Sequence, residues 1–404
     1  MRIEFFPSNA EGEIAAPPSK SMAHRYLVLA GLSDGESVVH NVSFSQDILA
    51  TLSCLRALGV RWKRNGNSVT VYGLPARSLK PEDFLSCDEC GSTLRFMVPV
   101  CLLTGERCVL TGSERLLSRP LSVYRDLCTE QGFIYEQTKT TLTVKGQLAP
   151  GDFIFPGNIS SQFVTGLLMT LPLLSADSRI LLTGGVESRS YIEMTLAAMA
   201  RFGVNADWSA EDRLYIPGRQ RYDPKDVTVE GDWSNAAFLY ALSFLHGGSV
   251  QVTGTSPDSL QGDRRCIGYI KSLSEHYSDI DLSDCPDLGP VLFAFAAANH
   301  GGHFTGTKRL SDKESDRVGA MAQELAKFGV CVKAGENEAD VSGSLRPPDT
   351  LLYGHNDHRI VMALSCLLSV TGGILEGVQA VRKSYPDFFQ DLEKLKVNMH
   401  YEAG

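Results

Sequence analysis

The sequence lacks any hydrophobic run long enough for a membrane-spanning helix. No apolar stretch approaches the roughly 18 residues that such a helix needs. The first residues, MRIEFFPSN, also lack the basic start and apolar core of a secretory signal, so we expect a cytoplasmic protein. Basic residues are in deficit, with 38 Lys and Arg against 47 Asp and Glu and a net charge of -9. This balance argues against a nucleic-acid-binding protein.

The spacing of a metal site is missing as well. The ten cysteines are scattered, and the one CxxC pair, Cys87 and Cys90, has no second pair at zinc-finger distance. Scattered cysteines in helical and strand-like segments are typical of free thiols in a reducing compartment. We therefore predict no metal site. The segment PPSKSMAHR also lacks the glycines of a nucleotide-binding P-loop.

What the sequence does contain is an internal repeat. Six times, a short polar turn precedes a helix of small apolar residues, and the copies start at residues 17, 87, 155, 230, 284 and 354. A repeat of this length indicates a repeated supersecondary unit. An amphipathic helix and a strand pair follow, as in DILATLSCLRALGVRWKRNGNSVTVYG. The predicted unit is βαβαββ, with a buried first helix and a solvent-facing second helix.

Six units divide into two sets of three, which predicts an α/β fold with two lobes. We expect a first lobe over residues 17–226 and a second lobe over residues 1–16 plus 227–404. The N-terminal strand RIEFF then belongs with the C-terminal set, and the fourth unit is short, without a recognisable second strand pair. Two chain crossings make a hinge, so we expect the functional site in a cleft between the lobes.

The polar turns before the repeated helices hold the candidate functional residues. Helix starts present free N–H groups and a positive dipole end, which attract anions. Taken alone, each of these turns is explained nearly as well by a solvated basic segment or a simple capping cluster. The candidates in the first three turns are Lys20, Ser21 and Arg25, then Gly91, then Ser160, Ser161 and Gln162.

The C-terminal half supplies the charged candidates. Asp287 opens the fifth repeated helix, where an Asp alone is usually a cap, and Glu314 alone could belong to a surface salt bridge. The remaining charged candidates are Lys313, Arg317, Arg359 and Lys383. They recur at the same phase of the repeat, which random surface charge would not do. We interpret the set as one anion-binding site.

Together, these motifs resemble the 5-enolpyruvylshikimate-3-phosphate synthase family from the start of the chain to its end. The motifs are PSKSxxxR, GSTxR, SRP, SSQF, EGDxSxA, QGD, PD, KESDR, NDHR and KSYPDF. The resemblance implies an inside-out α/β barrel of two lobes with three βαβαββ units each. It also implies a shikimate-pathway transferase that moves the enolpyruvyl group of phosphoenolpyruvate to the 5-hydroxyl of shikimate 3-phosphate. Phosphate leaves through a tetrahedral intermediate, without metal or organic cofactor.

The resemblance implies residue roles as well. Asp287, Glu314 and Lys20 are expected to be catalytic, with Asp287 as the base at the 5-hydroxyl and Glu314 handling the proton on the methylene carbon. The residues expected to bind shikimate 3-phosphate are Lys20, Ser21, Arg25, Ser160, Ser161, Gln162, Ser188, Tyr191, Asp287 and Lys313. The residues expected to bind phosphoenolpyruvate are Lys20, Gly91, Arg119, Gln162, Arg317, Arg359 and Lys383. Glyphosate inhibits this family at the phosphoenolpyruvate site.

The reaction independently needs such residues. One proton must reach carbon while a hydroxyl loses another, which two carboxylates and a lysine can do. Arginine suits carboxylate and phosphate groups. Because phosphorus is never attacked, the magnesium clamp of phosphoryl transfer is unnecessary.

Three positions depart from the family pattern, and two rival functions stay open. Glu89, Arg309 and Ser311 stand where other residues are common, which leaves the substrate contacts near them open. One rival is transfer to UDP-N-acetylglucosamine, whose enzyme lacks the PSKS, KESDR and NDHR set. The other is a non-catalytic anion-binding repeat protein, which gives no reason for Asp287 and Glu314 beside so many cations. We expect a monomer.

Overall fold

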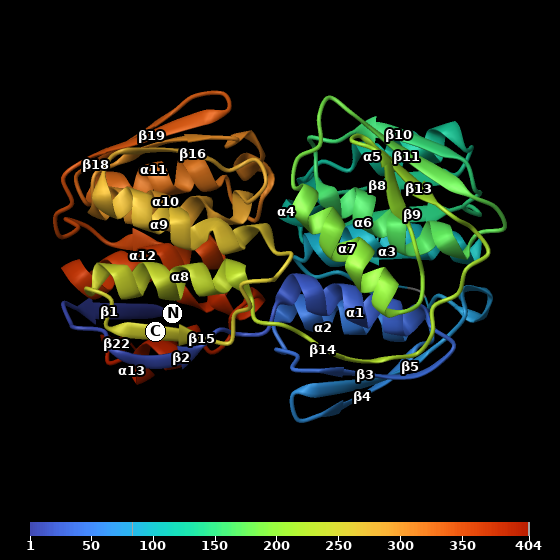
Figure 1. Ribbon diagram of the computed structural model, residues 1–404, viewed down its shortest axis with the longest axis horizontal. Coiled ribbons are helices and arrows are strands. Elements are labelled where there is room, and N and C mark those ends of the chain that lie inside the picture. The colour runs from blue at the N-terminus through green and yellow to red at the C-terminus, as the bar shows by residue number, and fades with distance from the viewer. Residues whose placement is uncertain (83, 403–404) are drawn as a thin grey trace. The chain divides into compact units, whose positions relative to one another are not determined.

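The computed structural model describes residues 1–82 and 84–402, which form an α/β fold of two compact units. The continuous unit is Lys20–Val229. The split unit combines Met1–Ser19 with Glu230–Gly404, so the blue strands β1 and β2 lie among yellow and red elements in Figure 1. The chain passes from one unit to the other after Ser19 and after Val229, and each unit has its own hydrophobic core.

Three four-stranded sheets of the same design build the continuous unit. Their orders are β14-β3-β5-β4, β6-β7-β9-β8 and β10-β11-β13-β12. In each sheet the first two strands are parallel and the other neighbours are antiparallel. The strands are β3 (Gly35–His40), β4 (Arg61–Asn65), β5 (Ser68–Gly73), β6 (Leu85–Ser86), β7 (Cys108–Thr111), β8 (Ile134–Gln137), β9 (Thr141–Lys145), β10 (Asp152–Pro156), β11 (Ser178–Thr183), β12 (Asp207–Ala210), β13 (Arg213–Ile216) and β14 (Asp226–Thr228).

The helices of the continuous unit confirm the predicted contrast between buried and surface helices. The first helix of each repeat is buried almost along its whole length, because most of its residues are small or apolar: α1 (Lys20–Leu32), α3 (Gly91–Thr104) and α6 (Ser161–Thr170). The second helices bury one face: α2 (Gln46–Ala57), α5 (Ser122–Glu130) and α7 (Arg189–Arg201), with the short α4 (Glu114–Ser118) before α5. Short 3-10 turns are η1 (Ala76–Ser78) and η2 (Leu171–Leu173).

The split unit repeats this design with one short sheet. Strand β1 pairs with β21 and β22, so the N-terminal strand lies in one sheet with strands from the C-terminal end of the chain. The sheets are β16-β17-β19-β18, β20-β21-β1-β22 and the two-stranded β15-β2, which is the short fourth repeat. The strands are β1 (Arg2–Phe6), β2 (Gly12–Ala15), β15 (Val250–Thr253), β16 (Ser278–Asp281), β17 (Gly302–Thr305), β18 (Val330–Ala334), β19 (Glu338–Gly343), β20 (Leu352–Tyr353), β21 (Gly373–Glu376) and β22 (Asn398–Glu402).

Buried helices also form the centre of the split unit. Helix α10 (Gly289–Ala298) packs against α8 (Trp233–Leu245) and α12 (His358–Thr371), and all three are mostly buried. Helices α9 (Cys266–Glu275), α11 (Arg317–Lys327) and α13 (Phe388–Lys394) complete the unit. The 3-10 turns are η3 (Gly262–Arg265), η4 (Pro286–Leu288), η5 (Lys308–Asp312) and η6 (Val378–Lys383).

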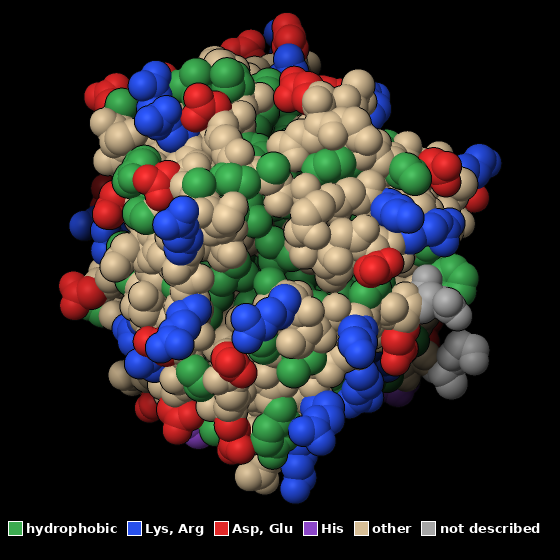
Figure 2. Space-filling view, turned by 90° about the vertical axis from the view of Figure 1, so that its right-hand side faces the viewer, with side chains coloured by type: hydrophobic (Ala, Val, Ile, Leu, Met, Phe, Trp, Pro, Cys, Tyr) green, Lys and Arg blue, Asp and Glu red, His purple; other side chains and the backbone are tan. Residues whose placement is uncertain are grey.

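The surface carries charges of both signs. Figure 2 views the molecule from the right-hand side of Figure 1, where basic and acidic side chains are intermixed around a central hollow with apolar side chains. In the parts of the chain that the structure describes, every helix is too short or too polar to span a membrane.

Candidate functional site

The charged candidates of the split unit meet around one buried arginine. The Arg317 guanidinium donates to Asp287 Oδ1 at 2.9 Å, to Glu314 Oε2 at 2.8 Å and to Asp357 Oδ2 at 2.8 Å. Its side chain is 1% exposed. Burial alone would lower the pKa of Arg317, but the three carboxylates raise it above the ordinary value. Arg317 is therefore a permanently charged centre that fixes three acids in place.

Asp287 is shared by three cations. Arg359 Nη2 donates to Asp287 Oδ2 at 3.1 Å, while Arg317 Nη1 at 2.9 Å and Lys313 Nζ at 3.3 Å approach Oδ1. Burial alone would raise the pKa of Asp287, but Arg359, Lys313 and Arg317 hold it well below its usual range. Asp287 is therefore ionised at neutral pH, with its negative charge spread over three partners.

Helix starts bring these residues together. Asp287 lies in η4, directly before α10, and Arg317 is the first residue of α11, which packs against α10. Asp357 caps α12, because its Oδ1 accepts from the Arg359 backbone N–H at 2.9 Å. The same carboxylate binds Arg317, so one side chain orders two helix starts.

Lys313 and Lys383 lie at the edge of this charged cluster. Burial, which outweighs the attraction of Asp287, lowers the pKa of Lys313 to about 8. Lys383 Nζ donates to the Asn356 backbone carbonyl at 2.5 Å, next to the cap of α12. Arg309, one of the departures from the family pattern, donates to the Ser283 carbonyl at 2.6 Å.

In the continuous unit, Arg25 has a different setting. Its guanidinium donates to Thr195 Oγ1 at 2.9 Å and Thr165 Oγ1 at 3.3 Å, and to the carbonyls of Ser21 at 2.7 Å and Tyr191 at 2.9 Å. All four acceptors are neutral. Burial lowers the pKa of Arg25 to about 10, so the group still carries its charge at neutral pH. Arg25 therefore joins α1, α6 and α7 around a buried positive charge.

A second polar group of the continuous unit surrounds Gly91. Arg95 Nη1 donates to Gln162 Oε1 at 2.6 Å, and Gln162 Nε2 donates to Ser92 Oγ at 2.9 Å. A methyl group on Gly91 would lie 2.7 Å from Arg119 Nη1 and 2.9 Å from Arg95 Nη1. The structure thus brings together Gly91, Arg119 and Gln162, three of the residues predicted to bind phosphoenolpyruvate.

The remaining candidates of the continuous unit lie at helix starts. Lys20 opens α1, and its Nζ donates to Asp47 Oδ2 at 2.6 Å. Ser160 caps α6 by accepting from the Gln162 N–H at 3.3 Å, with Ser161 next in the helix. Ser188 precedes α7 in a left-handed conformation (φ 54°, ψ 41°), and Tyr191 follows in the first turn of that helix.

Sequence reasoning missed three residues that organise these clusters: Asp47, Arg95 and Asp357. The sequence motifs contain two of them: Arg95 is the last residue of GSTLR, and Asp357 lies inside NDHR. Asp47 had no local signal, because its partner Lys20 lies on another helix. The structure also brings His24, Asp47 and Cys90 together as one group of possible metal ligands among the described residues, which no spacing in the sequence revealed.

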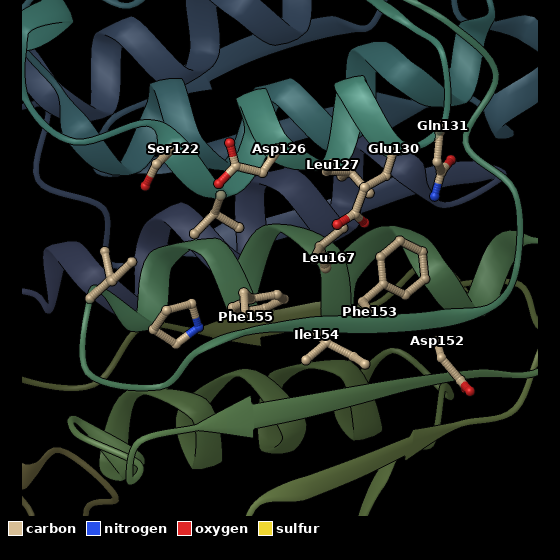
Figure 3. Close-up of a pocket in the computed structure, with 13 residues that line it drawn as sticks. Ser122, Asp126, Leu127, Glu130, Gln131, Asp152, Phe153, Ile154, Phe155 and Leu167 are labelled. Atoms are coloured by element: carbon tan, nitrogen blue, oxygen red, sulfur yellow. The ribbon is translucent and has the colours of Figure 1, made fainter.

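A separate pocket of about 190 Å³ lies beside α5 in the continuous unit. Figure 3 shows Asp126 and Glu130 of α5 facing Phe153 and Phe155 of β10 across it. Its lining contains none of the predicted site residues.

Comparisons with known proteins identify the family. The model of the EPSP synthase (3-phosphoshikimate 1-carboxyvinyltransferase) family matches residues 6–392. The 3-phosphoshikimate 1-carboxyvinyltransferases of Clostridium kluyveri and Clostridium novyi are 39% and 37% identical, each over 97% of this chain and 97% of the relative. The chain belongs to this family. The EPSP synthase from Acinetobacter baumannii, at 20% identity, has the same fold with a TM-score of 0.81 over 100% of both chains.

Membership confirms the predicted family and fold class. The chain is a transferase, and the predicted two-lobed α/β barrel agrees with the six sheets of the structure and with the fold of the Acinetobacter enzyme. The names of the relatives favour 3-phosphoshikimate over UDP-N-acetylglucosamine as the acceptor.

Proposed function

We propose that this protein transfers the enolpyruvyl group of phosphoenolpyruvate to the 5-hydroxyl of shikimate 3-phosphate and releases phosphate. The observation that carries this proposal is the cluster around Asp287, where one ionised carboxylate holds two arginines and a lysine beside a second acid, Glu314. A protein that only bound anions would gain nothing from two acids among its cations.

The first chemical step is addition. The 5-hydroxyl oxygen attacks C2 of phosphoenolpyruvate, its proton passes to Asp287, and the methylene carbon receives a proton from Glu314. In the free protein, the cations beside Asp287 make it a weak base. When the anionic phosphoenolpyruvate binds Arg359 and Arg317, it competes with Asp287 for those cations. The proton affinity of Asp287 then rises at the moment when a base is needed.

The second step is elimination. Glu314 takes a proton back from the new methyl carbon, the double bond forms again, and the C–O bond to phosphate breaks, while the proton held by Asp287 passes to the leaving phosphate. Glu314 is held for this by Arg317 at 2.8 Å. The step needs no attack on phosphorus, so none of the described residues has to position a metal ion. Lys20 supports both steps as a cation at the start of α1, beside both substrates.

Substrate binding is divided between the two ligands. We assign shikimate 3-phosphate to hydroxyl donors and helix starts of the continuous unit, together with Asp287 and Lys313 of the split unit. Its other ligands are Lys20, Ser21, Arg25, Ser160, Ser161, Gln162, Ser188 and Tyr191. We assign phosphoenolpyruvate to Lys20, Gly91, Arg119, Gln162, Arg317, Arg359 and Lys383.

Because the assigned residues come from both units, the reaction requires that both contribute to one site. The units then close when the ligands bind, since cations on both sides repel one another until an anion lies between them. Small-angle scattering tests this. The radius of gyration decreases with shikimate 3-phosphate plus an unreactive phosphoenolpyruvate mimic, whereas an unchanged radius contradicts closure.

We also propose that the enzyme works as a monomer in the cytoplasm. The ten cysteines are free, and nine of them are buried, as in proteins of a reducing compartment. Analytical ultracentrifugation tests the first statement and cell fractionation tests the second.

A phosphate-release assay tests the proposed reaction. Phosphoenolpyruvate is mixed with either shikimate 3-phosphate or UDP-N-acetylglucosamine, with and without a strong chelator. We expect release only with shikimate 3-phosphate, and no loss of rate in the chelator. Release with the nucleotide sugar would support the rival transferase, and binding without any release would support the anion-binding protein.

A further inference from the structure

Three potential metal ligands that the proposed reaction does not use as a set lie beside Lys20. His24 of α1, Asp47 of α2 and Cys90 before α3 place one nitrogen, oxygen or sulfur atom each within 4.8 Å of one another. All three residues are buried. They lie in the continuous unit, although 66 residues separate His24 from Cys90 in the chain.

The distances suit a tetrahedral ion. Cys90 Sγ lies 3.8 Å from His24 Nε2. Two ligands of one tetrahedral zinc ion are separated by about 3.5 Å, given Zn–S and Zn–N bonds of about 2.3 and 2.0 Å. The thiol and the imidazole therefore need to move by only a few tenths of an ångström. Three protein ligands would leave the fourth position open, as in zinc sites that bind a further molecule.

The imidazole is already oriented by a second layer of residues. Thr51 Oγ1 lies 2.8 Å from His24 Nδ1, and Thr93 Oγ1 lies 2.6 Å from Thr51 Oγ1. This contact leaves Nε2 facing Cys90. Ligating histidines generally use their other ring nitrogen for such a hydrogen bond, which fixes the ring.

The charges also match a divalent cation. A metal ion of this kind takes a neutral imidazole and a deprotonated thiol as ligands, so its binding releases the thiol proton. The Cys90 thiolate and the Asp47 carboxylate together then neutralise a charge of two.

Lys20 is the residue that such an ion would affect. Its Nζ donates to Asp47 Oδ2 at 2.6 Å, and its side chain is 15% exposed. An ion bound to Asp47 takes this carboxylate away from Lys20 and repels the ammonium group.

We propose that His24, Asp47 and Cys90 form an inhibitory site for a thiophilic divalent cation of the zinc class. Binding displaces Lys20 from Asp47 and so disturbs the substrate contacts of Lys20. The inhibition rests on the proposed function, whereas the metal site itself does not. Nitrogen and sulfur ligands select zinc, cobalt or cadmium over magnesium and calcium, which prefer oxygen.

Cobalt(II) binding tests the site directly. A cobalt–thiolate bond gives a charge-transfer absorption in the near ultraviolet, so this arm needs no enzymatic activity. We expect the band in the wild-type protein and its loss in Cys90→Ser, where the serine hydroxyl keeps the cap of α3. His24→Asn removes a direct ligand. It is expected to weaken cobalt binding by more than the roughly 10- to 100-fold caused by losing a residue that only hydrogen-bonds to a ligand. Cys331→Ser, which removes an exposed thiol, is the matched control and is expected to keep the band.

Zinc inhibition tests the consequence. Zinc is expected to inhibit the wild-type enzyme and Cys331→Ser, with full recovery in a chelator, while Cys90→Ser turns over normally and resists zinc. Magnesium is expected to have no effect.

Three results would overturn the proposal. A cobalt–thiolate band of equal strength in Cys90→Ser, or no band in the wild type, would show that His24 and Cys90 share only a hydrogen bond. Equal zinc inhibition of wild type and Cys90→Ser would place the inhibition elsewhere. A protein without any transferase activity would instead contradict the proposed function, and the cobalt arm would still decide the metal site.

Discussion

The two units use arginine in opposite ways. In the split unit, Arg317 is surrounded by the carboxylates of Asp287, Glu314 and Asp357. In the continuous unit, Arg25 is equally buried but donates only to hydroxyl and carbonyl oxygens. The first cation is neutralised by its neighbours, whereas the second keeps its positive charge available to a ligand.

The two arginine environments suit different tasks, proton transfer in one case and anion binding in the other. Carboxylates beside cations can exchange protons, but an incoming anion must compete with them for the same arginines. The neutral acceptors around Arg25 do not exchange protons, and they leave its positive charge to attract an anion without such competition. We therefore propose that the acids of the split unit carry the proton transfer, and that Arg25 of the continuous unit holds a substrate in place.

Asp287→Asn should have the largest effect. The substitution removes the base while keeping the size of the side chain, so we expect turnover to fall by about 10²–10⁴-fold. Phosphoenolpyruvate should bind as well as before or more tightly, because Arg359 and Arg317 lose their internal competitor. Steady-state rates and calorimetric titration measure the two quantities. Asp284→Asn, which alters a carboxylate paired with the exposed Arg265, is the control. A fall in turnover of less than tenfold in Asp287→Asn would contradict the assignment of Asp287 as the base.

Arg359→Ala should weaken one ligand selectively. A hydrogen bond to a charged group contributes about 1.5–3 kcal/mol, so phosphoenolpyruvate affinity should fall roughly ten- to hundredfold. The affinity for shikimate 3-phosphate should change much less. Titration of each ligand into the variant measures this, with Arg265→Ala as a control for removal of an exposed arginine. Equal losses of affinity for both ligands would contradict the assignment of Arg359 to phosphoenolpyruvate.

Gly91→Ala should distinguish glyphosate from phosphoenolpyruvate. The added methyl group would press on the guanidinium groups of Arg119 and Arg95, at 2.7 and 2.9 Å. Such overpacking costs about 1–3 kcal/mol, and the longer glyphosate has less room to adapt. The wild-type enzyme should be sensitive, and the variant should lose more affinity for glyphosate than for phosphoenolpyruvate. Inhibition constants for glyphosate and Michaelis constants for phosphoenolpyruvate, measured side by side, test this. An equal loss of affinity for both ligands would mean that Gly91 is needed only for the backbone conformation of the turn.

Lys313 should produce a smaller, pH-dependent effect. Because burial lowers its pKa to about 8, the ammonium group is present below pH 8 and is lost as the pH rises through that value. Shikimate 3-phosphate should therefore bind less tightly above pH 8. In Lys313→Arg, the guanidinium stays charged and this decline should disappear. An unchanged pH profile in the arginine variant would contradict a contact between Lys313 and the phosphate.

The helix starts were predictable, but most of their partners were not. A polar turn followed by a small-residue helix is a local pattern, so the sequence predicts the starts of α1, α3 and α12 correctly. In the sequence, Asp357 has the position of a simple helix cap. Its second contact is an ion pair with Arg317, which lies 40 residues away in the chain. Likewise, Cys90 looks like half of a CxxC pair with Cys87, although its sulfur contacts His24 of another helix.

The short fourth repeat shows the same limit for the fold. The sequence of that repeat has no second strand pair, and its sheet has only β15 and β2 among the described residues. The partner β2 comes from the N-terminal segment, more than 200 residues earlier in the chain. Pairing across that distance depends on how the buried helices pack, and no local pattern contains it.

Deuterium incorporation tests most directly whether the split unit carries the proton transfer. In D₂O, addition places deuterium on the methylene carbon of phosphoenolpyruvate, and elimination leaves part of it in the product, where proton NMR detects it. We expect incorporation with the wild-type enzyme and with Asp312→Asn, which alters an exposed neighbouring acid. Glu314→Gln is expected to lose both incorporation and turnover while still binding both substrates. Exchange at the wild-type rate in Glu314→Gln would contradict the role of this carboxylate and the division of work between the units.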